Sequence, residues 1–367
     1  MKNNMPKGLQ LQAATATIKT AALNHNLQRV KEFAPNCKVL AVVKANAYGH
    51  GLLPVANHLD EVDAFGVARI EEALTLRAGG VIKPILLLEG FYSLADLSIA
   101  VTNNIHTVVH TVEQLEALEQ AQLDLPAQVW LKIDTGMNRL GVRPEQTEAV
   151  VKRLEACPNV AKPLRFISHF CCADELDNPF SAQQITCFDQ VSSQYQGERS
   201  LAASAGIVAW PDSHYQWVRP GIMLYGVSPV ETRSAASLGL KPVMTLSASL
   251  IAINDVKKGE TVGYGARWQA ERDTRIGVIA IGYGDGYPRM APNGTPVLVN
   301  GRRVVTAGRV SMDMLSVDLG PDAKDKVGDK AVLWGDGLPA EEVAEHIGTI
   351  AYELVTKLTS RVVMQYV

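Results

Sequence analysis

The chain has 367 residues, of which 47% are hydrophobic and 20% charged, and its formal net charge is -3. This composition is typical of a globular protein with enough apolar residues for large cores, and the length predicts about two domains. Intrinsic disorder would need fewer apolar residues and a larger net charge. Lys and Arg (35) do not exceed Asp and Glu (38), so a nucleic-acid partner is not expected.

The sequence also indicates a compartment. It contains no apolar run of about 18 residues or more, so no membrane-spanning segment is expected. The first residues, MKNNMPKGLQLQ, lack the apolar stretch of a secretory signal. The five cysteines are an odd number without paired spacing, which fits a reducing compartment better than a disulfide scaffold. We therefore expect a cytoplasmic protein that acts on a small molecule.

Short apolar runs alternate with helical patterns over the first two-thirds of the chain. The runs are Val39–Val43, Ala64–Ala68, Ile85–Leu88, Thr107–Val109, Val129–Ile133, Leu164–Ile167, Leu201–Ser204 and Trp217–Arg219. Amphipathic patterns between them predict helices, for example over Val112–Gln122 and Arg143–Cys157. Because eight such strand–helix units are typical of a closed parallel sheet, we predict a (β/α)8 TIM barrel over residues 10–240. A doubly wound dinucleotide-binding fold would need G-x-G-x-x-G after the first strand, where this sequence has KANAYGHG.

The pattern changes after a polar stretch of small residues at 230–241, which predicts a linker. Alternation then predicts strands at Thr245–Ile253, Arg275–Ile281, Pro296–Val299 and Met314–Leu319, followed by helices at Ala340–Ile347 and Ala351–Leu358. The pair Asn300-Gly301 between two strand-like runs predicts a hairpin turn. We therefore expect a mainly β C-terminal domain over residues 241–367.

Polar residues end or directly follow several of the barrel runs. Active sites of TIM barrels lie at the C-terminal ends of the strands, so these residues are the first candidates. They are Lys44, Lys132, Asp134, Arg139, His169, Ser204 and Arg219. Ser204 and Gly221-Ile222 follow the last two strands, where barrels often bind phosphate. A phosphate site opposite Lys44 predicts a phosphorylated aldehyde held as a Schiff base, and pyridoxal 5′-phosphate (PLP) is the common one.

Six segments resemble the motifs of bacterial alanine racemases. In chain order they are AVVKANAYGHG (Ala41–Gly51), LKIDTGMNRLG (Leu131–Gly141), VRPGIMLYG (Val218–Gly226), VGYGARW (Val262–Trp268), IGYGDGYPR (Ile281–Arg289) and GRVSMDM (Gly308–Met314). The resemblance runs from about residue 10 to the end. It implies a PLP-bearing barrel, a β-rich C-terminal domain, and a homodimer whose active sites take residues from both subunits. The implied reaction interconverts L-alanine and D-alanine, which supplies D-alanine for peptidoglycan in a bacterium.

The resemblance also implies a role for each matching residue. Lys44 would hold PLP and act as one base, and Tyr264 of the other subunit would be the second base, on the opposite face. Arg219 would face the pyridine nitrogen, and His169 would lie between Arg219 and Tyr264. An arginine can only donate, so the nitrogen would stay unprotonated and the ring would be a weaker electron sink. This weaker sink would limit transamination and decarboxylation.

Further matching residues would bind the phosphate and the substrate. The residues implied for the phosphate are Tyr48, Ser204, Gly221 and Ile222. Those implied for the substrate entrance are Met312, Asp313 and Tyr283. Arg139 would hold the ring oxygen and the substrate carboxylate, oriented by Lys132, which matches a lysine often found carbamylated. The sequence has Ser360 where some relatives have a tyrosine that touches the phosphate.

Alternative functions remain at this point. A barrel-fold amino-acid decarboxylase would place a carboxylate on the pyridine nitrogen, so Arg219 argues against it. A PLP-binding homeostasis protein would be a barrel without a second domain, so the β half from about Val243 argues against that function. The sequence distinguishes least well between an alanine racemase and a racemase that also accepts serine or other amino acids, because the range of accepted side chains depends on the shape of the cavity. No metal is expected, since the adjacent Cys171 and Cys172 near His169 lack C-x2-C spacing.

Overall fold

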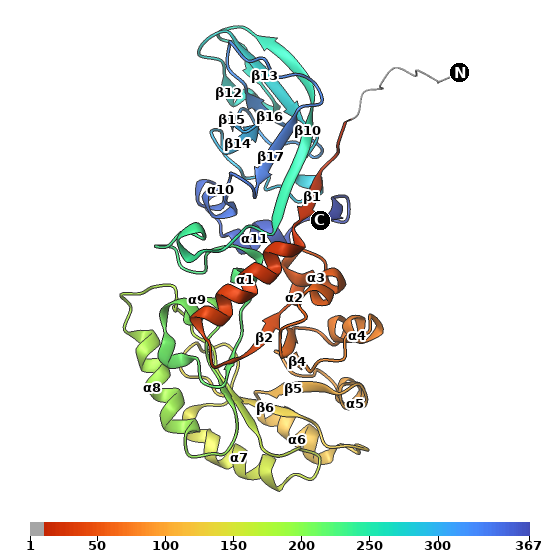
Figure 1. Cartoon of the computed structure of the whole chain (residues 1–367), viewed down its shortest axis with the longest axis vertical. Helices are drawn as coiled ribbons and strands as arrows, with labels where there is room; N and C mark the ends of the chain where they lie inside the picture. Colours follow the sequence, from red (N-terminus) through yellow and green to blue (C-terminus); the bar gives the residue numbers. More distant parts are fainter. Residues whose placement is uncertain (1–10) are drawn as a thin grey trace, which may run out of the picture. The chain divides into compact units, whose positions relative to one another are not determined.

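The computed structural model describes residues 11–367, which form two compact units (Figure 1). One unit comprises residues 22–241, and the other comprises residues 11–21 together with 242–367. Residue 10, the predicted start of the barrel, lies outside the described residues. The same is true of most of the N-terminal segment, for which no secretory signal was predicted. Within residues 11–367, no helix is long and apolar enough to cross a membrane.

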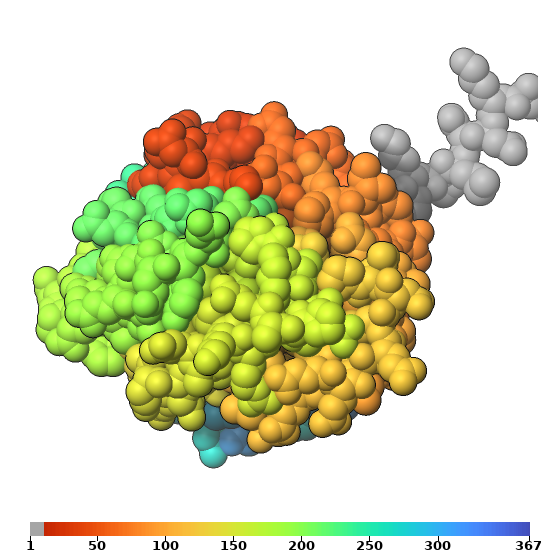
Figure 2. Space-filling model, turned by 90° about the horizontal axis from the view of Figure 1, so that it is seen from below, coloured from red at the N-terminus to blue at the C-terminus, as the bar shows by residue number. Residues whose placement is uncertain are grey.

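The unit of residues 22–241 is a barrel of parallel strands with helices outside it. The strands are β2 (Lys38–Val42), β3 (Ala64–Val67), β4 (Ile85–Leu87), β5 (Ile105–Val109), β6 (Val129–Lys132), β7 (Arg165–Ile167), β8 (Arg199–Ser200) and β9 (Trp217–Val218). Their order is β8-β7-β6-β5-β4-β3-β2-β9. The sequence colours follow one another around the face shown in Figure 2, as expected when consecutive βα units are neighbours. The predicted TIM barrel is confirmed.

The helices of this unit are α1 (Thr20–Phe33), α2 (Lys44–Tyr48), α3 (Leu52–His58), α4 (Ile70–Ala78), α5 (Leu94–Thr102), α6 (Val112–Gln120), α7 (Thr147–Ala156), α8 (Phe180–Ser192) and α9 (Ser204–Ala209). Helix α1 precedes the first barrel strand, and the other helices of this unit lie between or after its strands. Helix α6 shows why these segments are helical, because Thr111 caps its first turn and Leu115 and Leu118 are fully buried on one face. Strands β3 and β4 are buried along their whole length, as parallel strands between core and helices must be.

The barrel closes between β8 and β9, its two shortest strands. An isolated bridge joins Ala203 to Arg219, and the Arg219 N–H donates to the Ala202 carbonyl at 2.9 Å. The predicted strand Leu201–Ser204 is wrong in position, because the strand is Arg199–Ser200 and Ser204 begins helix α9. Leu201 and Ala202 are fully buried, so the apolar run continues past the end of β8 into the segment that bridges to Arg219.

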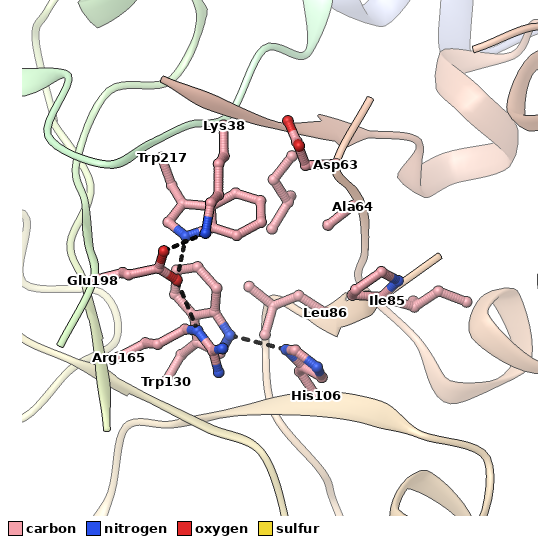
Figure 3. A pocket seen from close by; sticks show the side chains of 12 residues that line it. Lys38, Asp63, Ala64, Ile85, Leu86, His106, Trp130, Arg165, Glu198 and Trp217 are labelled. Atoms are coloured by element: carbon pink, nitrogen blue, oxygen red, sulfur yellow. Dashed lines mark hydrogen bonds and ion pairs between the residues drawn. The ribbon is translucent and has the colours of Figure 1, made fainter. Parts of the chain in front are cut away.

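Side chains from the strand starts close the N-terminal end of the barrel around a cavity of about 270 Å³ (Figure 3). Lys38 and Arg165 both pair with Glu198, at 2.5 and 3.2 Å, and the Trp217 indole donates to the same carboxylate at 2.9 Å. Each cation also lies over an indole, Lys38 over Trp217 and Arg165 over Trp130. Both cations are paired with one carboxylate and stacked over indoles, so we interpret this cluster as a structural closure of the barrel.

The second unit is mainly antiparallel β-sheet, which confirms the predicted C-terminal β domain. Its strands are β1 (Thr15–Ile18), β10 (Met244–Val256), β11 (Thr261–Val262), β12 (Trp268–Gln269), β13 (Thr274–Ile279), β14 (Pro296–Val299), β15 (Arg302–Thr306), β16 (Leu315–Asp318), β17 (Lys330–Trp334) and β18 (Val363–Tyr366). The large sheet has the order β13-β16-β15-β14-β17-β10-β1-β18, and β13 also pairs with β10. Helices α10 (Ala340–Ile347) and α11 (Ala351–Thr356) belong to this unit. The predicted turn at Asn300-Gly301 joins β14 to β15 with positive φ at both residues.

The first strand of the chain differs from the predicted domain range. Strand β1 pairs antiparallel with β10, with Thr15 opposite Ser247, and parallel with β18, with Thr15 opposite Val363. The range of 10–240 predicted for the barrel therefore includes a strand of the β unit. Four residues, TATI, are too short to reveal a strand by alternation, and their partners lie more than 200 residues away along the chain.

Candidate active site

Lys44 follows β2 directly after Val43, at the C-terminal end of the strand. The next residues, from Ala45 to Tyr48, all have positive φ, between 51° and 55°. This left-handed conformation costs an L-residue roughly 1–2 kcal/mol, so the surrounding structure must hold the turn. One such contact runs from the Leu52 N–H to the Asn46 side-chain oxygen at 2.9 Å. The turn carries Lys44 at its start and Tyr48 at its end.

Four cationic side chains contribute positive charge at this end of the barrel. They are Lys44, Lys132, Arg139 and Arg219. Burial is the largest cause that lowers the pKa of Lys44, and Arg139 lowers it further. Lys132 ends β6 and is 9% exposed, and burial lowers its pKa to about 8 with contributions from Arg219, Arg139 and Lys44. Burial also lowers the pKa of Arg219 to about 9, so its guanidinium stays charged at neutral pH. This excess of positive charge favours an anionic ligand.

Arg219 is buried and donates to the ends of neighbouring strands. It donates to the Ser200 hydroxyl and the Ser168 carbonyl, both at 2.6 Å, and to the Leu201 carbonyl at 3.1 Å. Its Nη2 also lies 3.4 Å from His169 Nδ1. Because arginine has no acceptor, His169 Nδ1 must be the acceptor, which leaves the ring proton on Nε2. Burial, followed by the charge of Arg219, holds the pKa of His169 well below its usual value, which favours a neutral ring over an imidazolium.

Ser204, Gly221 and Tyr48 converge at the closure of the barrel. The Ser204 hydroxyl accepts from the Gly221 N–H at 2.8 Å and from the Met223 N–H at 3.4 Å. A Cβ on Gly221 would lie 2.5 Å from the Tyr48 hydroxyl oxygen, so any larger residue would displace the Tyr48 side chain. Burial raises the pKa of Tyr48 to about 12, which keeps its phenol protonated and able to donate. These hydroxyls and backbone N–H groups can hold a phosphate, with Ile222 buried behind them at the start of a 3-10 turn.

The loop after β6 carries Arg139 and is fixed by Asp134. The Asp134 carboxylate accepts from the Gly136 and Asn138 N–H groups, both at 3.0 Å. A bridge between Ile133 and Val142 returns the loop to the strand. Arg139 is exposed at the loop tip, and its charge still acts on Lys44, Lys132 and His169. The loop therefore presents a guanidinium at the edge of the cation cluster.

The other predicted site residues lie in the β unit. Tyr264 follows β11 and is 70% exposed, at the tip of the small β11–β12 hairpin. Tyr283 and Met312 lie on two turns that pair through backbone bonds, from the Tyr283 N–H to the Ser311 carbonyl (3.0 Å) and from the Gly284 N–H to the Met312 carbonyl (2.8 Å). Asp313 lies on the second turn and pairs with Arg361 at 2.8 Å.

The structure thus collects the predicted residues into two groups. The barrel group is Lys44, Tyr48, Lys132, Arg139, His169, Ser204, Arg219, Gly221 and Ile222. The group in the β unit comprises Tyr264, Tyr283, Met312 and Asp313. Within the barrel group, a lysine with a lowered pKa, a set of phosphate donors and a buried guanidinium fit a phosphorylated aldehyde of the PLP type.

Glu89 is a site residue that the sequence analysis missed. It follows β4 after Leu88, and its charge raises the pKa of both Lys44 and Lys132. It also accepts from the Tyr92 hydroxyl at 2.5 Å. The rule that polar residues at strand ends form the site applies to Glu89 as well as to Lys44, so the sequence did contain the signal.

Comparisons with known proteins agree over both units. Residues 18–229 match the family "Alanine racemase, N-terminal domain", and residues 243–366 match "Alanine racemase, C-terminal domain". An alanine racemase from Photobacterium profundum is 70% identical over 97% of this chain and 100% of its own length. One from Vibrio cholerae is 68% identical over 97% of this chain and 99% of its own.

Solved structures give the same result. The biosynthetic alanine racemase from Pseudomonas aeruginosa has a TM-score of 0.94 and 48% identity, covering 97% of this chain and 99% of its own. The alanine racemase from Acinetobacter baumannii has a TM-score of 0.92 and 39% identity, covering 97% of this chain and 100% of its own.

Proposed function

Because this chain belongs to the alanine racemase family, we propose that it interconverts L-alanine and D-alanine with PLP and two bases, Lys44 and Tyr264. The observation that supports this proposal most strongly is the half-buried Lys44, whose pKa is lowered, in the barrel that also carries the hydrogen-bonded pair Ser204 and Gly221. We also propose that the reaction takes place in the cytoplasm and that its D-alanine enters peptidoglycan, as the resemblance to bacterial alanine racemases implies.

The barrel residues would bind and orient PLP. Tyr48, Ser204 and the N–H groups of Gly221 and Ile222 would hold the phosphate. Arg219 would donate to the pyridine nitrogen and keep it unprotonated, since a guanidinium has no lone pair that could accept a hydrogen bond from a protonated ring. Bound PLP supplies an electron sink that acidifies the α-hydrogen of the substrate. Arg219 limits the strength of that sink, which favours reprotonation at the α-carbon over side reactions.

Lys44 would move the proton on one face of the substrate. Burial, and to a smaller extent the charge of Arg139, lowers the pKa of its amine, so that a larger neutral fraction is available as a base near neutral pH. Arg139, at the edge of the same cluster, would bind the substrate carboxylate. The excess of cations suits both the phosphate of the cofactor and this carboxylate.

Tyr264 would move the proton on the other face, from a second copy of the chain. In its own unit Tyr264 is 70% exposed, and Met290, Met312 and Met314 are exposed in the same unit. A homodimer would cover such apolar side chains and bring Tyr264 to the partner's barrel. There His169 Nε2–H would donate to the phenol oxygen of the partner subunit's Tyr264, since Arg219 occupies Nδ1. Tyr283, Met312 and Asp313 would line the entrance.

Lys132 would act on Arg139 after carbamylation. Burial lowers the pKa of Lys132 to about 8, and the charges of Arg219, Arg139 and Lys44 affect that pKa more than the carboxylate of Glu89 does. A neutral amine adds to carbon dioxide, forming a nitrogen–carbon bond and releasing one proton, which gives a carbamate anion. Such an anion would pair with Arg139 and orient it.

The experiment that tests this proposal follows L-alanine with the purified protein and PLP in deuterated water. We expect racemisation with deuterium at the α-carbon. Tyr264→Phe should lower racemisation by about 10²–10⁴-fold yet still exchange the α-hydrogen of one enantiomer, because Lys44 remains. Release of carbon dioxide without racemisation would instead indicate a decarboxylase, and no exchange at all would refute the proposal. Equal rates with L-serine would indicate a broader racemase.

A further inference from the structure

The turn after Lys44 is held by local hydrogen bonds, such as the one that Asn46 accepts from Leu52, and by one contact from outside the turn. Ala45 and the next three residues adopt left-handed conformations, and none of them is a glycine. The amide N–H of Ala45 is the first backbone donor after Lys44, so its partner controls how the chain leaves the strand. That partner is a side chain from the following βα unit rather than part of the turn.

The partner is Glu72, in the first turn of α4. Its Oε1 accepts from the Ala45 N–H at 2.7 Å, while its Oε2 accepts from the N–H groups of Ala68 and Arg69 at 2.9 and 3.2 Å. One carboxylate therefore joins the residue after Lys44 to the end of β3 and the start of α4. Hydrogen bonds to an ionised carboxylate are stronger than neutral ones, and both oxygens are needed here.

Glu72 differs in this respect from its neighbour Glu71. Glu71 is exposed and lies in the same helical turn, so it contributes a similar charge at the helix N-terminus. Within residues 11–367, the Glu71 carboxylate makes no side-chain hydrogen bond or ion pair. A negative charge at the start of α4 is therefore not enough to hold the Ala45–Tyr48 turn. Of these two glutamates, only Glu72 bonds to that turn.

We propose that Glu72 is a positioning residue that holds the Ala45–Tyr48 turn, and through it the side chains of Lys44 and Tyr48, in their working positions. The inference rests on the proposed function, in which Lys44 carries PLP and Tyr48 binds its phosphate. Glu72 touches neither the substrate nor the cofactor in this role. It acts by fixing the backbone between two residues that must reach opposite ends of one ligand.

The test compares Glu72→Gln with the matched control Glu71→Gln in the full-length protein. A glutamine keeps the size of the side chain but has a single acceptor oxygen, so it cannot serve both sites. Hydrogen exchange of the cofactor-free protein is measured on the peptide covering residues 44–51 and on the helix α4. We expect exchange at residues 44–51 to accelerate at least about tenfold in Glu72→Gln and to stay unchanged in Glu71→Gln.

A second measurement links the turn to catalysis. With PLP, Glu72→Gln should bind the cofactor at least about tenfold more weakly, the scale of one lost charge-assisted hydrogen bond. Its kcat should fall while the KM for alanine stays within a few fold, because Arg139 is untouched. Glu71→Gln should match the unsubstituted protein in all three quantities.

Two results would overturn the inference. One is faster exchange in α4 with no change at residues 44–51, which would make Glu72 a helix cap only. The other is unchanged PLP binding and kcat in Glu72→Gln. If Glu72→Gln does not fold, the same measurements are made on Glu72→Asp, whose side chain is shorter by one methylene group. The same two results would then overturn the inference. Failure of the unsubstituted protein to bind PLP would count against the proposed function instead, since the exchange comparison needs no cofactor.

Discussion

Replacement of Lys132 by methionine should stabilise the cofactor-free protein at neutral pH. Lys132 is 9% exposed and carries its charge among Arg219, Arg139 and Lys44. Methionine has a similar length and keeps most of the packing, but removes the buried charge. The variant thus tests whether the cation cluster that we propose to bind the anionic cofactor also destabilises the fold.

The expected magnitude follows from the pKa of Lys132. Burial lowers it from 10.5 to about 8, and each pKa unit corresponds to 1.36 kcal/mol, so protonated Lys132 costs about 3 kcal/mol of folding free energy. The folded state binds this proton more weakly than the unfolded chain. The cost is therefore fully present below pH 8, decreases as the pH rises, and disappears above the unfolded pKa of 10.5.

Urea unfolding at several pH values is the assay, with solutions free of carbon dioxide to prevent carbamylation. At pH 7 Lys132→Met should have a free energy of unfolding about 3 kcal/mol higher than the unsubstituted protein, and the gap should close towards pH 11. Lys152→Met, on the exposed face of α7, is the control and should show little difference at either pH. A less stable Lys132→Met at pH 7, or a gap independent of pH, would refute this reasoning.

Two further predictions concern the cofactor site. Gly221→Ala places a Cβ 2.5 Å from the Tyr48 hydroxyl oxygen, so PLP affinity, measured by absorbance titration, should fall at least about tenfold while the fold loses about 1–3 kcal/mol; unchanged affinity would argue against a phosphate site there. Arg219→Glu places a carboxylate where a guanidinium now lies, which allows the pyridine nitrogen to hold a proton, so pyruvate formed per racemisation event should rise. A variant with the same pyruvate yield would show that Arg219 does not limit side reactions.

The sequence predicted the elements that depend on local patterns, and the misses have physical reasons. Strand ends identified Lys44, His169 and Arg219 because a charge after a buried apolar strand is unusual. The carboxylate of Glu72 was not identified, since a glutamate in the first turn of a helix is ordinary there and its bond to Ala45 depends on the tertiary fold.

Short strands were the other difficulty. Strand β8 has two residues, and its position is set by barrel closure rather than by apolar pattern. Strand β1 depends on pairing with Ser247 and Val363, which lie far along the chain. Neither arrangement leaves a periodic signal in the sequence around it.

The central claim is that the amine of Lys44 carries the cofactor aldehyde, and one measurement tests it directly. The protein is incubated with PLP, reduced with borohydride, digested and analysed by mass spectrometry. We predict a reduced PLP adduct on the peptide containing Lys44, and none on the same peptide of Lys44→Ala. An adduct on Lys132, or an unmodified Lys44 in a protein that has bound PLP, would contradict the account.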